Sequence, residues 1–445
     1  MMKGFIISGT ATGAGKSTLT VGILAALKHL GLKVQAFKAG PDYLDPTYHR
    51  LALAKPTYNL DEILTSPGLV RRLFYEKAKA ADVAVVEGVM GLFDGRDEQF
   101  SGSTYRLAKL LNLPVILVVD AQNLGTTVAA QVYGYLKFKK DIKIAGIILN
   151  KVSGKNHAEH LLSALKPLGV KVFGVFYQNE LPRLKSRHLG LIPATEERNI
   201  VEIIKEIKDK VLAKINFADL LATLPELTVP KKLPAIKYPD LQGKRVAYAF
   251  DKAFNFYYQE AIEYLRRSNV EVFAVSPLND SDFPPVDLLF LGGGYPELFA
   301  RDLFLNQKFI QNLKKKIQGG LRVYAECGGF IYLTSGVKVK EQTYPLTGIL
   351  PGEMELTDKL QGLGYYRGKP VGGYLGKNFQ NEIWGHKFHY STYTGPQDNP
   401  AYLLRKNGRE AFDGVARDNI FASFLHLNFY GKADLVKTLV GGIKG

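Results

Sequence analysis

The chain holds one cysteine, Cys327, and its neighbours are those expected of a catalytic nucleophile. It stands in the segment Ala325-Glu326-Cys327-Gly328-Gly329, directly after an apolar run that predicts a β-strand. Glycines after the thiol permit a sharp turn from strand into helix, and the N-terminus of such a helix favours the thiolate. A lone thiol forms neither an intrachain disulfide nor a metal site of several cysteines. An inert core residue is the alternative, but the order of strand, cysteine and glycines favours a nucleophile.

A second reactive motif spans residues 9–17, which read Gly-Thr-Ala-Thr-Gly-Ala-Gly-Lys-Ser between a predicted strand and a predicted helix. This pattern predicts a phosphate-binding loop, in a variant form whose first glycine comes one residue early; a glycine-rich turn of another kind is the alternative. The glycines let backbone N–H groups wrap phosphate oxygens, and the helix N-terminus adds partial positive charge. Lys16 would reach the β- and γ-phosphates of ATP, and the Ser17 hydroxyl would ligate Mg²⁺. The residues expected to bind ATP are Gly9, Thr10, Thr12, Gly13, Ala14, Gly15, Lys16, Ser17 and Thr18.

Carboxylates follow other predicted strands, at the edge where parallel sheets bind ligands. Glu87 ends an apolar run and is a candidate ligand of Mg²⁺ or of its bound water. Asp42 and Asp45 lie in the loop after the second predicted strand, and Asp94 lies in a loop shortly after Glu87. An ordinary turn is the alternative for the first loop, but its place at the same edge favours a site. The expected metal ligands are Ser17, Asp45 and Glu87.

Two α/β units are needed to position these motifs. In residues 1–200, strand-like runs alternate with helical stretches, which predicts a parallel sheet with helices on both faces. Strands are expected at residues 4–8, 33–37, 83–86, 115–119, 144–149 and 172–176, and helices at residues 16–30, 104–111, 124–137 and 158–167.

A proline-rich stretch at residues 224–234 cannot form a regular element and indicates a linker. A second alternation of strands and helices starts at residue 245 and leads to Cys327, and short β-like segments follow it. The expected division is a P-loop synthetase domain over residues 1–205, a linker over 206–243 and a second domain over 244–445.

The composition of the 445 residues is that of a globular protein, with 46% apolar and 22% charged residues. The N-terminus runs straight into the phosphate-binding loop, so no cleaved signal is expected, and a single cysteine indicates the reducing cytoplasm. The net charge of +16 comes from dispersed basic residues without a nucleic-acid-binding motif. Neither nucleic acid nor a membrane is therefore an expected partner. Solvated helix faces or a small polyanionic substrate would explain the charge.

Taken together, these motifs resemble those of a known enzyme family. Over essentially its whole length the chain resembles the cobyrinate a,c-diamide synthases, glutamine-dependent amidotransferases of corrinoid synthesis. The N-terminal half is similar to the dethiobiotin synthetase group of P-loop enzymes, and the C-terminal half to the class I glutamine amidotransferases, which implies a flavodoxin-like second domain. The related cobyric acid synthases carry Gln-Asn-Met where this chain has Gly40-Pro41-Asp42. The segments that carry the resemblance are residues 37–46, 58–61, 87–95, 187–191, 253–258, 292–298, 325–329 and 422–427.

The resemblance implies that His426 activates Cys327 to attack the amide of L-glutamine. Backbone N–H groups near Gly293 and Gly328 are the candidates for the oxyanion hole. Many class I glutaminases carry a glutamate two residues after the histidine, but Asn428 stands there in this chain. A Cys–His dyad is therefore expected rather than a full triad.

The resemblance also implies the substrates. ATP with Mg²⁺ would convert the a- and c-acetate carboxylates of a cobyrinate-type polycarboxylate tetrapyrrole into acyl phosphates, which ammonia from glutamine would then amidate. Hydrogenobyrinate and nickel sirohydrochlorin are alternative substrates for the same residues, and a homodimer is left open. A regulatory or partitioning P-loop ATPase is disfavoured, because residues 10–12 lack its signature lysine and it has no glutaminase half. The expected substrate contacts are Lys38, Asp42, Tyr43, Leu44 and Asp94.

Overall fold

The computed structural model describes residues 2–187, 190–191 and 193–441. The chain divides into two compact units, Met1–Pro234 and Ala235–Gly445. His188 and Leu189, which belong to one of the segments that carry the resemblance, lie outside the described residues.

A parallel sheet forms the centre of the first unit. Its strand order is β3-β2-β4-β1-β5-β6-β7, and neighbouring strands pair in parallel throughout. The strands are rich in valine and isoleucine and are buried on both faces, as is usual for parallel sheets covered by helices. The strands are β1 (Lys3–Gly9), β2 (Val34–Ala39), β3 (Tyr58–Leu60), β4 (Val83–Gly91), β5 (Val115–Asp120), β6 (Ile144–Val152) and β7 (Val172–Tyr177).

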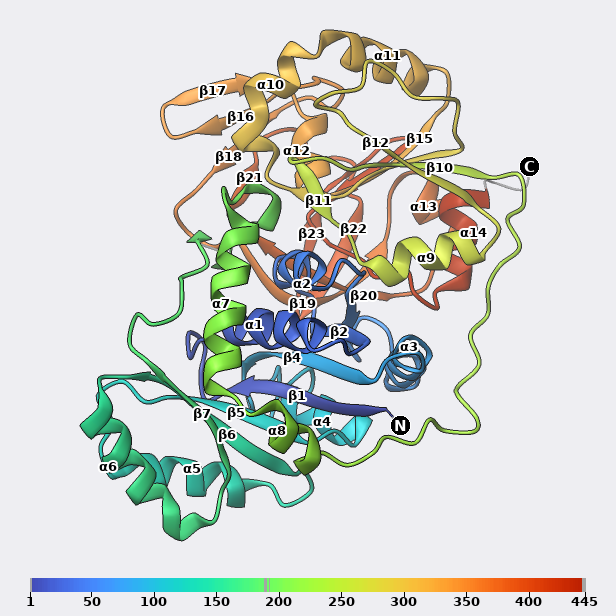
Figure 1. Ribbon diagram of the computed structural model, residues 1–445. Coiled ribbons are helices and arrows are strands. Elements are labelled where there is room, and N and C mark those ends of the chain that lie inside the picture. The colour runs from blue at the N-terminus through green and yellow to red at the C-terminus, as the bar shows by residue number, and fades with distance from the viewer. Residues whose placement is uncertain (1, 188–189, 192, 442–445) are drawn as a thin grey trace. The chain divides into compact units, whose positions relative to one another are not determined.

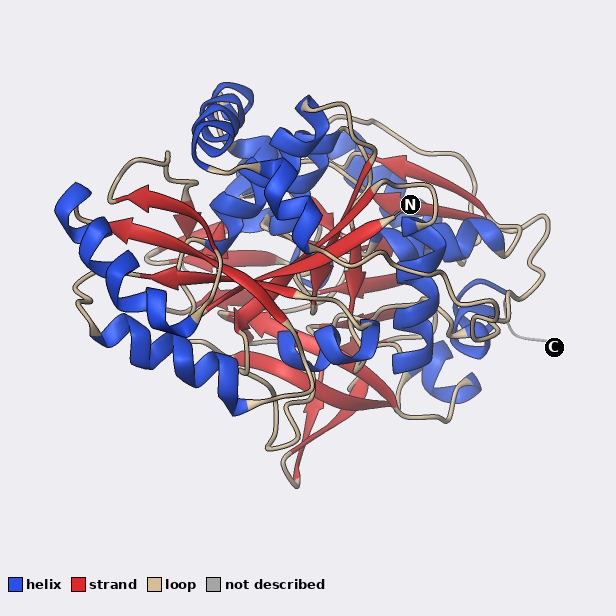
Figure 2. Cartoon of the chain, turned by 60° about the horizontal axis from the view of Figure 1, so that its bottom comes forward, coloured by secondary structure: helices blue, strands red, loops and turns tan. Residues whose placement is uncertain are grey.

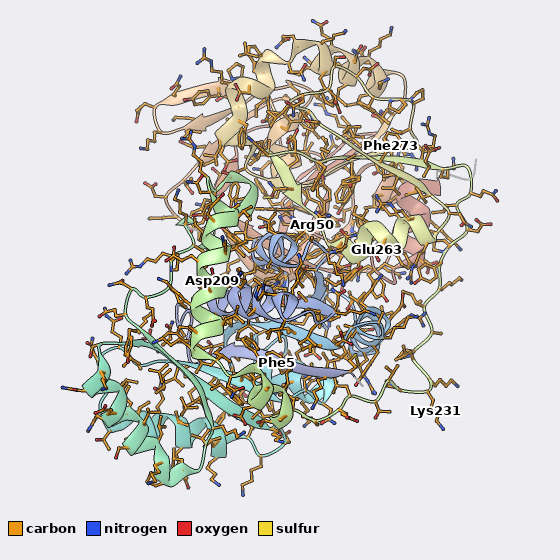
Figure 3. The ribbon with its side chains drawn as sticks, viewed as in Figure 1. Phe5, Arg50, Asp209, Lys231, Glu263 and Phe273 are labelled. Carbon is orange, nitrogen blue, oxygen red and sulfur yellow. The ribbon has the colours of Figure 1, made fainter. Side chains whose placement is uncertain are left out.

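Helices flank the strands, so the predicted α/β class is confirmed (Figure 1, Figure 2). Helices α1 and α7 share a hydrophobic core with one face of the sheet, in which Phe5 and Ile7 of β1 are fully buried. Phe5 lies in this interior, whereas Lys231 projects outward from an extended segment (Figure 3). The helices are α1 (Lys16–His29), α2 (Asp45–Leu53), α3 (Pro67–Ala78), α4 (Thr104–Leu111), α5 (Thr127–Phe138), α6 (Lys155–Leu165), α7 (Ile200–Lys214) and α8 (Phe217–Thr223).

The sequence-based expectations for this unit include neither strand β3 nor helices α2, α3 and α8. Helix α2 begins at Asp45, inside the loop expected after the second predicted strand. Pro46 reads as a loop signal, but proline is well tolerated in the first turn of a helix, where its missing N–H removes no hydrogen bond.

Part of the range expected as a linker, residues 206–243, is helical. Helices α7 and α8 run through this range, and Ile207 and Val211 are buried against Gly22 of α1. The two compact units divide between Pro234 and Ala235, later than the first expected boundary and earlier than the second.

The second unit is built on a sheet with the order β12-β10-β13-β15-β25-β24. All pairs are parallel except that between β24 and β25. The first five strands follow the flavodoxin-like order 2-1-3-4-5, so the predicted fold class is confirmed here too. The strands are β10 (Arg245–Ala249), β12 (Glu271–Val275), β13 (Leu288–Leu291), β15 (Arg322–Glu326), β24 (Val415–Ala416) and β25 (Ile420–Ser423).

The remaining elements of this unit are helices and smaller sheets. The helices are α9 (Gln259–Arg267), α10 (Ala300–Leu305), α11 (Gln307–Gln318), α12 (Gly328–Leu333), α13 (Gly373–Asn378) and α14 (Ala433–Gly441). One small sheet contains β16 (Gly336–Val339), β17 (Gln342–Pro345), β18 (Glu353–Leu356) and β21 (Ser391–Tyr393), and another contains β19 (Gly362–Pro370), β20 (Ile383–His389), β22 (Tyr402–Lys406) and β23 (Arg409–Asp413). The short pair β11 (Phe254–Phe256) with β14 (Gly293–Gly294) also belongs to this unit, whereas the short pair β8 (Ser186–Arg187) with β9 (Gly190–Leu191) belongs to the first unit.

Within the described residues, no helix combines the length and the apolar character needed to cross a bilayer.

The close approach of α1 and α7 predicts opposite effects on stability for two glycine-to-alanine substitutions. A Cβ atom at Gly22 would lie 2.7 Å from methyl groups of Ile207 and Val211, whereas a Cβ at Gly134 of α5 meets no atom within 4 Å. Helix propensity alone favours alanine at both positions by about 1 kcal/mol. We expect Gly134→Ala to raise the melting temperature of the first unit and Gly22→Ala to lower it, measured by differential scanning calorimetry. An equal rise in both variants would contradict this packing.

Candidate active sites

The phosphate-binding loop joins β1 to α1 and needs glycine at two positions. Gly13 and Gly15 have φ angles of +83° and +95°, in the left-handed region that favours glycine. A Cβ at Gly15 would also lie only 2.1 Å from Nδ2 of Asn150, which donates a hydrogen bond to the Ala14 carbonyl at 2.9 Å. Gly15 is the N-cap of α1, so the loop opens onto the N-terminus of that helix, where anions bind well.

Three neighbouring segments anchor the start of this loop. The Thr10 N–H donates to the Val118 carbonyl at 3.0 Å, and the Tyr135 hydroxyl donates to the Thr10 carbonyl at 2.6 Å. The Leu92 N–H donates to the Gly9 carbonyl at 3.0 Å. The loop conformation is therefore fixed from β5, α5 and the segment after β4.

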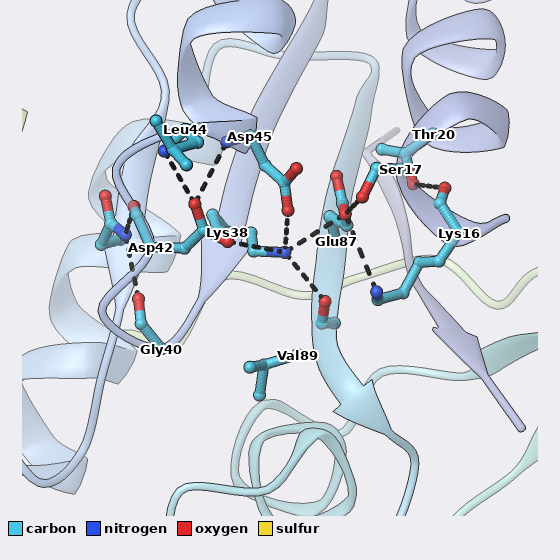
Figure 4. A network of polar contacts seen from close by, with 12 residues as sticks. Lys16, Ser17, Thr20, Lys38, Gly40, Asp42, Leu44, Asp45, Glu87 and Val89 are labelled. Carbon is cyan, nitrogen blue, oxygen red and sulfur yellow. Dashed lines mark hydrogen bonds and ion pairs between the residues drawn. The ribbon is translucent and has the colours of Figure 1, made fainter. Parts of the chain in front are cut away.

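A network of charged side chains from β2, β4 and the start of α2 lies beside the loop (Figure 4). The Lys38 ammonium forms an ion pair with Asp45, lies 3.2 Å from Oε1 of Glu87 and donates to the Gly88 carbonyl at 3.1 Å. Asp42 contributes a longer ion pair of 3.6 Å to the same ammonium. Lys38 and Glu87 are both buried, with 2% and 0% exposure.

The charges in this network determine its protonation. Burial alone would lower the pKa of Lys38, but the carboxylates of Asp45, Glu87 and Asp42 outweigh it and raise that pKa. Burial alone would raise the pKa of Glu87, but Lys38 and His49 outweigh it and hold that pKa well below its usual value. Burial, followed by the neighbouring charges of Asp42 and Glu87, raises the pKa of Asp45. Burial and the nearby Lys38 ammonium lower the pKa of Lys16, which lies 4.0 Å from Glu87.

Two of the expected metal ligands are adjacent. The Ser17 hydroxyl donates to Oε1 of Glu87 at 2.7 Å. Neighbouring oxygens in an octahedral Mg²⁺ site with bonds of about 2.1 Å lie about 3 Å apart, so this pair fits the ion. Asp45 is instead held by Lys38. In the part of the chain that the structure describes, no cluster of three or more His, Cys, Asp or Glu side chains could hold a metal. A bound Mg²⁺ would thus take its other oxygens from phosphates and water, as is common for this ion.

Apart from Lys38 of β2, the expected substrate residues lie in two loops. Asp42 Oδ1 accepts hydrogen bonds from the N–H groups of Leu44 and Asp45, at 2.8 and 3.1 Å, and so caps the start of α2. The Asp42 side chain is 30% exposed, which makes it the most accessible carboxylate around Lys38. Leu44 is buried and Tyr43 is half-buried. Asp94 Oδ2 accepts from the Gly91 N–H at 2.9 Å and closes its own loop.

One residue of the network, His49, is absent from the sequence-based expectations. Its Nε2 lies 2.6 Å from Oε2 of Glu87, and the side chain is fully buried. His49 follows Asp45 by four residues, which places both on one face of α2. That spacing would have revealed it only if the helix beginning at Asp45 had been predicted.

In the second unit, Cys327 lies in a strained turn between β15 and α12. Its φ of +47° is rare for a residue other than glycine and is typical of functional turns. The Cys327 N–H donates to the Ser423 carbonyl of β25 at 2.8 Å. A Cβ at Gly329 would lie 2.1 Å from the Leu291 carbonyl oxygen, so the helix after Cys327 can approach β13 only with glycine at this position. The thiol is thus presented at the end of a central strand.

His426 lies beside this turn, together with both predicted oxyanion-hole glycines. Burial alone would lower its pKa, but Cys327 and Glu326 outweigh it and raise the pKa of His426 to about 10. A Cβ at Gly293 would lie 2.5 Å from Cε1 of His426, and a Cβ at Gly328 would lie 2.9 Å from the Gly294 nitrogen. The structure therefore brings together all four residues that the sequence assigns to glutamine hydrolysis.

Asn428, which replaces the glutamate found at this position in many class I glutaminases, has other partners. Its Nδ2 donates to Oε1 of the buried Glu260 at 2.7 Å, and its Oδ1 accepts from the Tyr430 N–H at 3.0 Å. The carboxylate beside His426 is instead Glu326, whose Oε2 lies 3.5 Å from Nδ1 of His426. Glu326 is not among the site residues predicted from the sequence.

Comparisons with known proteins agree with this division into two sites. A model described as the CobQ/CobB/MinD/ParA nucleotide binding domain matches residues 5–192. A model described as the CobB/CobQ-like glutamine amidotransferase domain matches residues 245–434.

Full-length relatives share one name, cobyrinate a,c-diamide synthase. The chain is 37% identical to that of Caldanaerobacter subterraneus subsp. tengcongensis, over 98% of this chain and 97% of the relative. It is 35% identical to that of Listeria monocytogenes over the whole of both chains. It is 38% identical to that of Synechocystis over 97% of this chain and 92% of the relative. The chain therefore belongs to the cobyrinate a,c-diamide synthase family of glutamine-dependent amidotransferase ligases.

Proposed function

We propose that the chain amidates the a- and c-acetate carboxylates of cobyrinate, using ATP and L-glutamine, in cobalamin biosynthesis. The observation that carries this proposal is the presence of two complete sets of reactive groups in one chain. One set is the Lys16, Ser17 and Glu87 constellation at a phosphate-binding loop, and the other is the Cys327–His426 pair. The choice of cobyrinate as the substrate rests on the name of the full-length relatives.

Glutamine hydrolysis would begin with attack of the Cys327 sulfur on the side-chain carbonyl carbon of glutamine. The thiol proton passes to His426, which then returns it to the departing nitrogen as the C–N bond breaks and ammonia leaves. Water hydrolyses the resulting thioester to glutamate. The N–H groups near Gly293 and Gly328 would stabilise the oxyanion of both tetrahedral intermediates.

Amide synthesis would begin with transfer of the γ-phosphoryl group of ATP to a carboxylate oxygen of the substrate. ADP leaves, ammonia attacks the acyl carbon, and phosphate departs as the amide forms. Lys16 would stabilise the negative charge on the transferred group, and Ser17 and Glu87 would hold Mg²⁺, which neutralises phosphate charge when bound. Asp45 forms an ion pair with Lys38, which also contacts Glu87. We therefore assign Asp45 a role in positioning Lys38 and, through it, Glu87.

We assign the contacts with the acetate side chain to Lys38, Asp42, Tyr43, Leu44 and Asp94. Asp42 is partly exposed, while Lys38 and Asp45 are buried behind it, so a substrate would reach the network from the Asp42 side. A polycarboxylate substrate also suits a chain of net charge +16, because a positive field raises its rate of association.

Mass spectrometry of the products tests this function. Cobyrinate, hydrogenobyrinate and nickel sirohydrochlorin would each be incubated with the enzyme, ATP, Mg²⁺ and glutamine. We expect cobyrinate to gain two amides. Absence of amidation with cobyrinate would refute the proposal, and amidation of another macrocycle alone would identify a different substrate.

Replacing glutamine by ammonia as the nitrogen source tests the two sites independently. We expect Cys327→Ala to abolish glutamine-dependent amidation and to leave amidation with high ammonium chloride within about twofold of the wild type, because the thiol acts only on glutamine. Lys16→Ala should abolish amidation with either nitrogen source. The two rates would be measured by product chromatography. Retained ammonia-dependent activity in Lys16→Ala would contradict the assignment of the phosphate-binding loop.

The buried carboxylate at position 45 should matter for synthesis alone. We expect Asp45→Asn to lower the ammonia-dependent amidation rate by at least about tenfold, equivalent to about 1.4 kcal/mol, because it removes the charge that holds Lys38. The exposed Asp209 of α7 offers a control, and Asp209→Asn should change neither the rate of glutamate release nor the rate of amidation. An equal loss of glutamate release and amidation in Asp45→Asn would argue against a role at the synthetase site.

A further inference from the structure

We propose that Glu326 is the residue that positions His426, in place of the glutamate that is missing at position 428. This proposal rests on the proposed glutaminase activity of the second unit. Glu326 is the last residue of β15 and directly precedes Cys327, so one short segment supplies both the nucleophile and the carboxylate.

The turn at Cys327 allows both side chains to reach one histidine. Successive residues of a regular strand point to opposite faces, so Glu326 and Cys327 would normally diverge. The positive φ of Cys327 departs from that geometry. The side chains of both residues interact with His426, and Oε2 of Glu326 lies 3.5 Å from its Nδ1. Such contacts are often long in the absence of substrate and shorten in the reacting complex.

The carboxylate of Glu326 is held by its other oxygen. Oε1 accepts a hydrogen bond from the Tyr324 hydroxyl at 3.0 Å and another from the Leu427 N–H at 2.9 Å. Leu427 follows His426 directly, so the carboxylate is fastened to the segment that carries the histidine. Glu326 is only 1% exposed, and a buried carboxylate needs such partners.

This arrangement gives His426 the tautomer that the reaction requires. An Nδ1–H that faces Glu326 leaves Nε2 to take the proton from the Cys327 thiol. The carboxylate then stabilises the imidazolium while the C–S bond forms and the carbonyl electrons move to oxygen. His426 returns the same proton to the leaving nitrogen.

A second buried carboxylate nearby, Glu260, provides the matched control. It is fully buried, like Glu326, and it accepts a hydrogen bond from Asn428, two residues beyond the histidine. Replacement of either glutamate by glutamine preserves shape and removes one charge. A comparison of the two variants therefore tests which carboxylate supports His426.

Glutamate release from glutamine is the primary readout. For Glu326→Gln we expect kcat to fall by roughly 10²- to 10⁴-fold with KM for glutamine within about threefold of the wild type. Ammonia-dependent amidation should be unchanged in this variant. Glu260→Gln should keep kcat for glutamate release within about threefold of the wild type.

The pH profile separates a charge effect from a structural one. The groups that act on the charge of His426 are Cys327, Glu326 and His389. Because Glu326 raises the pKa of His426, its replacement should move the basic limb of the glutaminase profile to lower pH. Glu326→Asp should restore part of kcat by restoring the charge.

Three results would overturn the proposal. Glu326→Gln could keep the wild-type kcat for glutamate release, or the loss could appear in Glu260→Gln instead. Loss of ammonia-dependent amidation together with a lower melting temperature in Glu326→Gln would assign the residue to the fold. Failure of the proposed function would look different, because the wild type would then amidate cobyrinate with neither nitrogen source.

Discussion

The phosphate site depends on one buried carboxylate, Glu87, and on the groups that neutralise it. Glu87 is fully buried in the middle of β4, a central strand of the first unit. A buried carboxylate without partners costs several kcal/mol, so the surrounding groups are a condition for folding as well as for binding. Lys38 comes from β2, His49 from α2 and Ser17 from α1. One charge thus fixes three elements relative to the strand, which is the preorganisation that the proposed phosphoryl transfer would need.

The second unit places its reactive group by strain rather than by charge. The left-handed backbone of Cys327 costs of order 1–3 kcal/mol, and it persists because the surrounding contacts hold it. The hydrogen bond to Ser423 and the close approach of Gly329 to Leu291 are two of those contacts. Both units nonetheless follow the same rule, since the reactive residues lie at the carboxyl ends of central parallel strands.

The parts that were predictable from sequence were those whose chemistry is local. The phosphate-binding loop and the segment around Cys327 each carry their glycines within a few residues of the reactive group, so a single stretch reveals them. His49 was not predictable in this way, because its role depends on α2, whose start at Asp45-Pro46 reads as a loop. The packing of α7 was not predictable, because its apolar residues are buried against Gly22 of α1, which lies far away in the sequence. Glu326 was overlooked because strand alternation directs it away from Cys327, and only the turn itself brings both to His426.

The proposed function depends on the transfer of nitrogen from glutamine at Cys327 to a substrate carboxylate activated at the phosphate-binding loop. It is tested most directly by incubating the wild-type enzyme with cobyrinate, ATP, Mg²⁺ and glutamine labelled with ¹⁵N at its amide, followed by mass spectrometry of the product. The account predicts a diamide that carries the label in both new amides. An unlabelled diamide, or release of labelled ammonia with no amidation of cobyrinate, would contradict it.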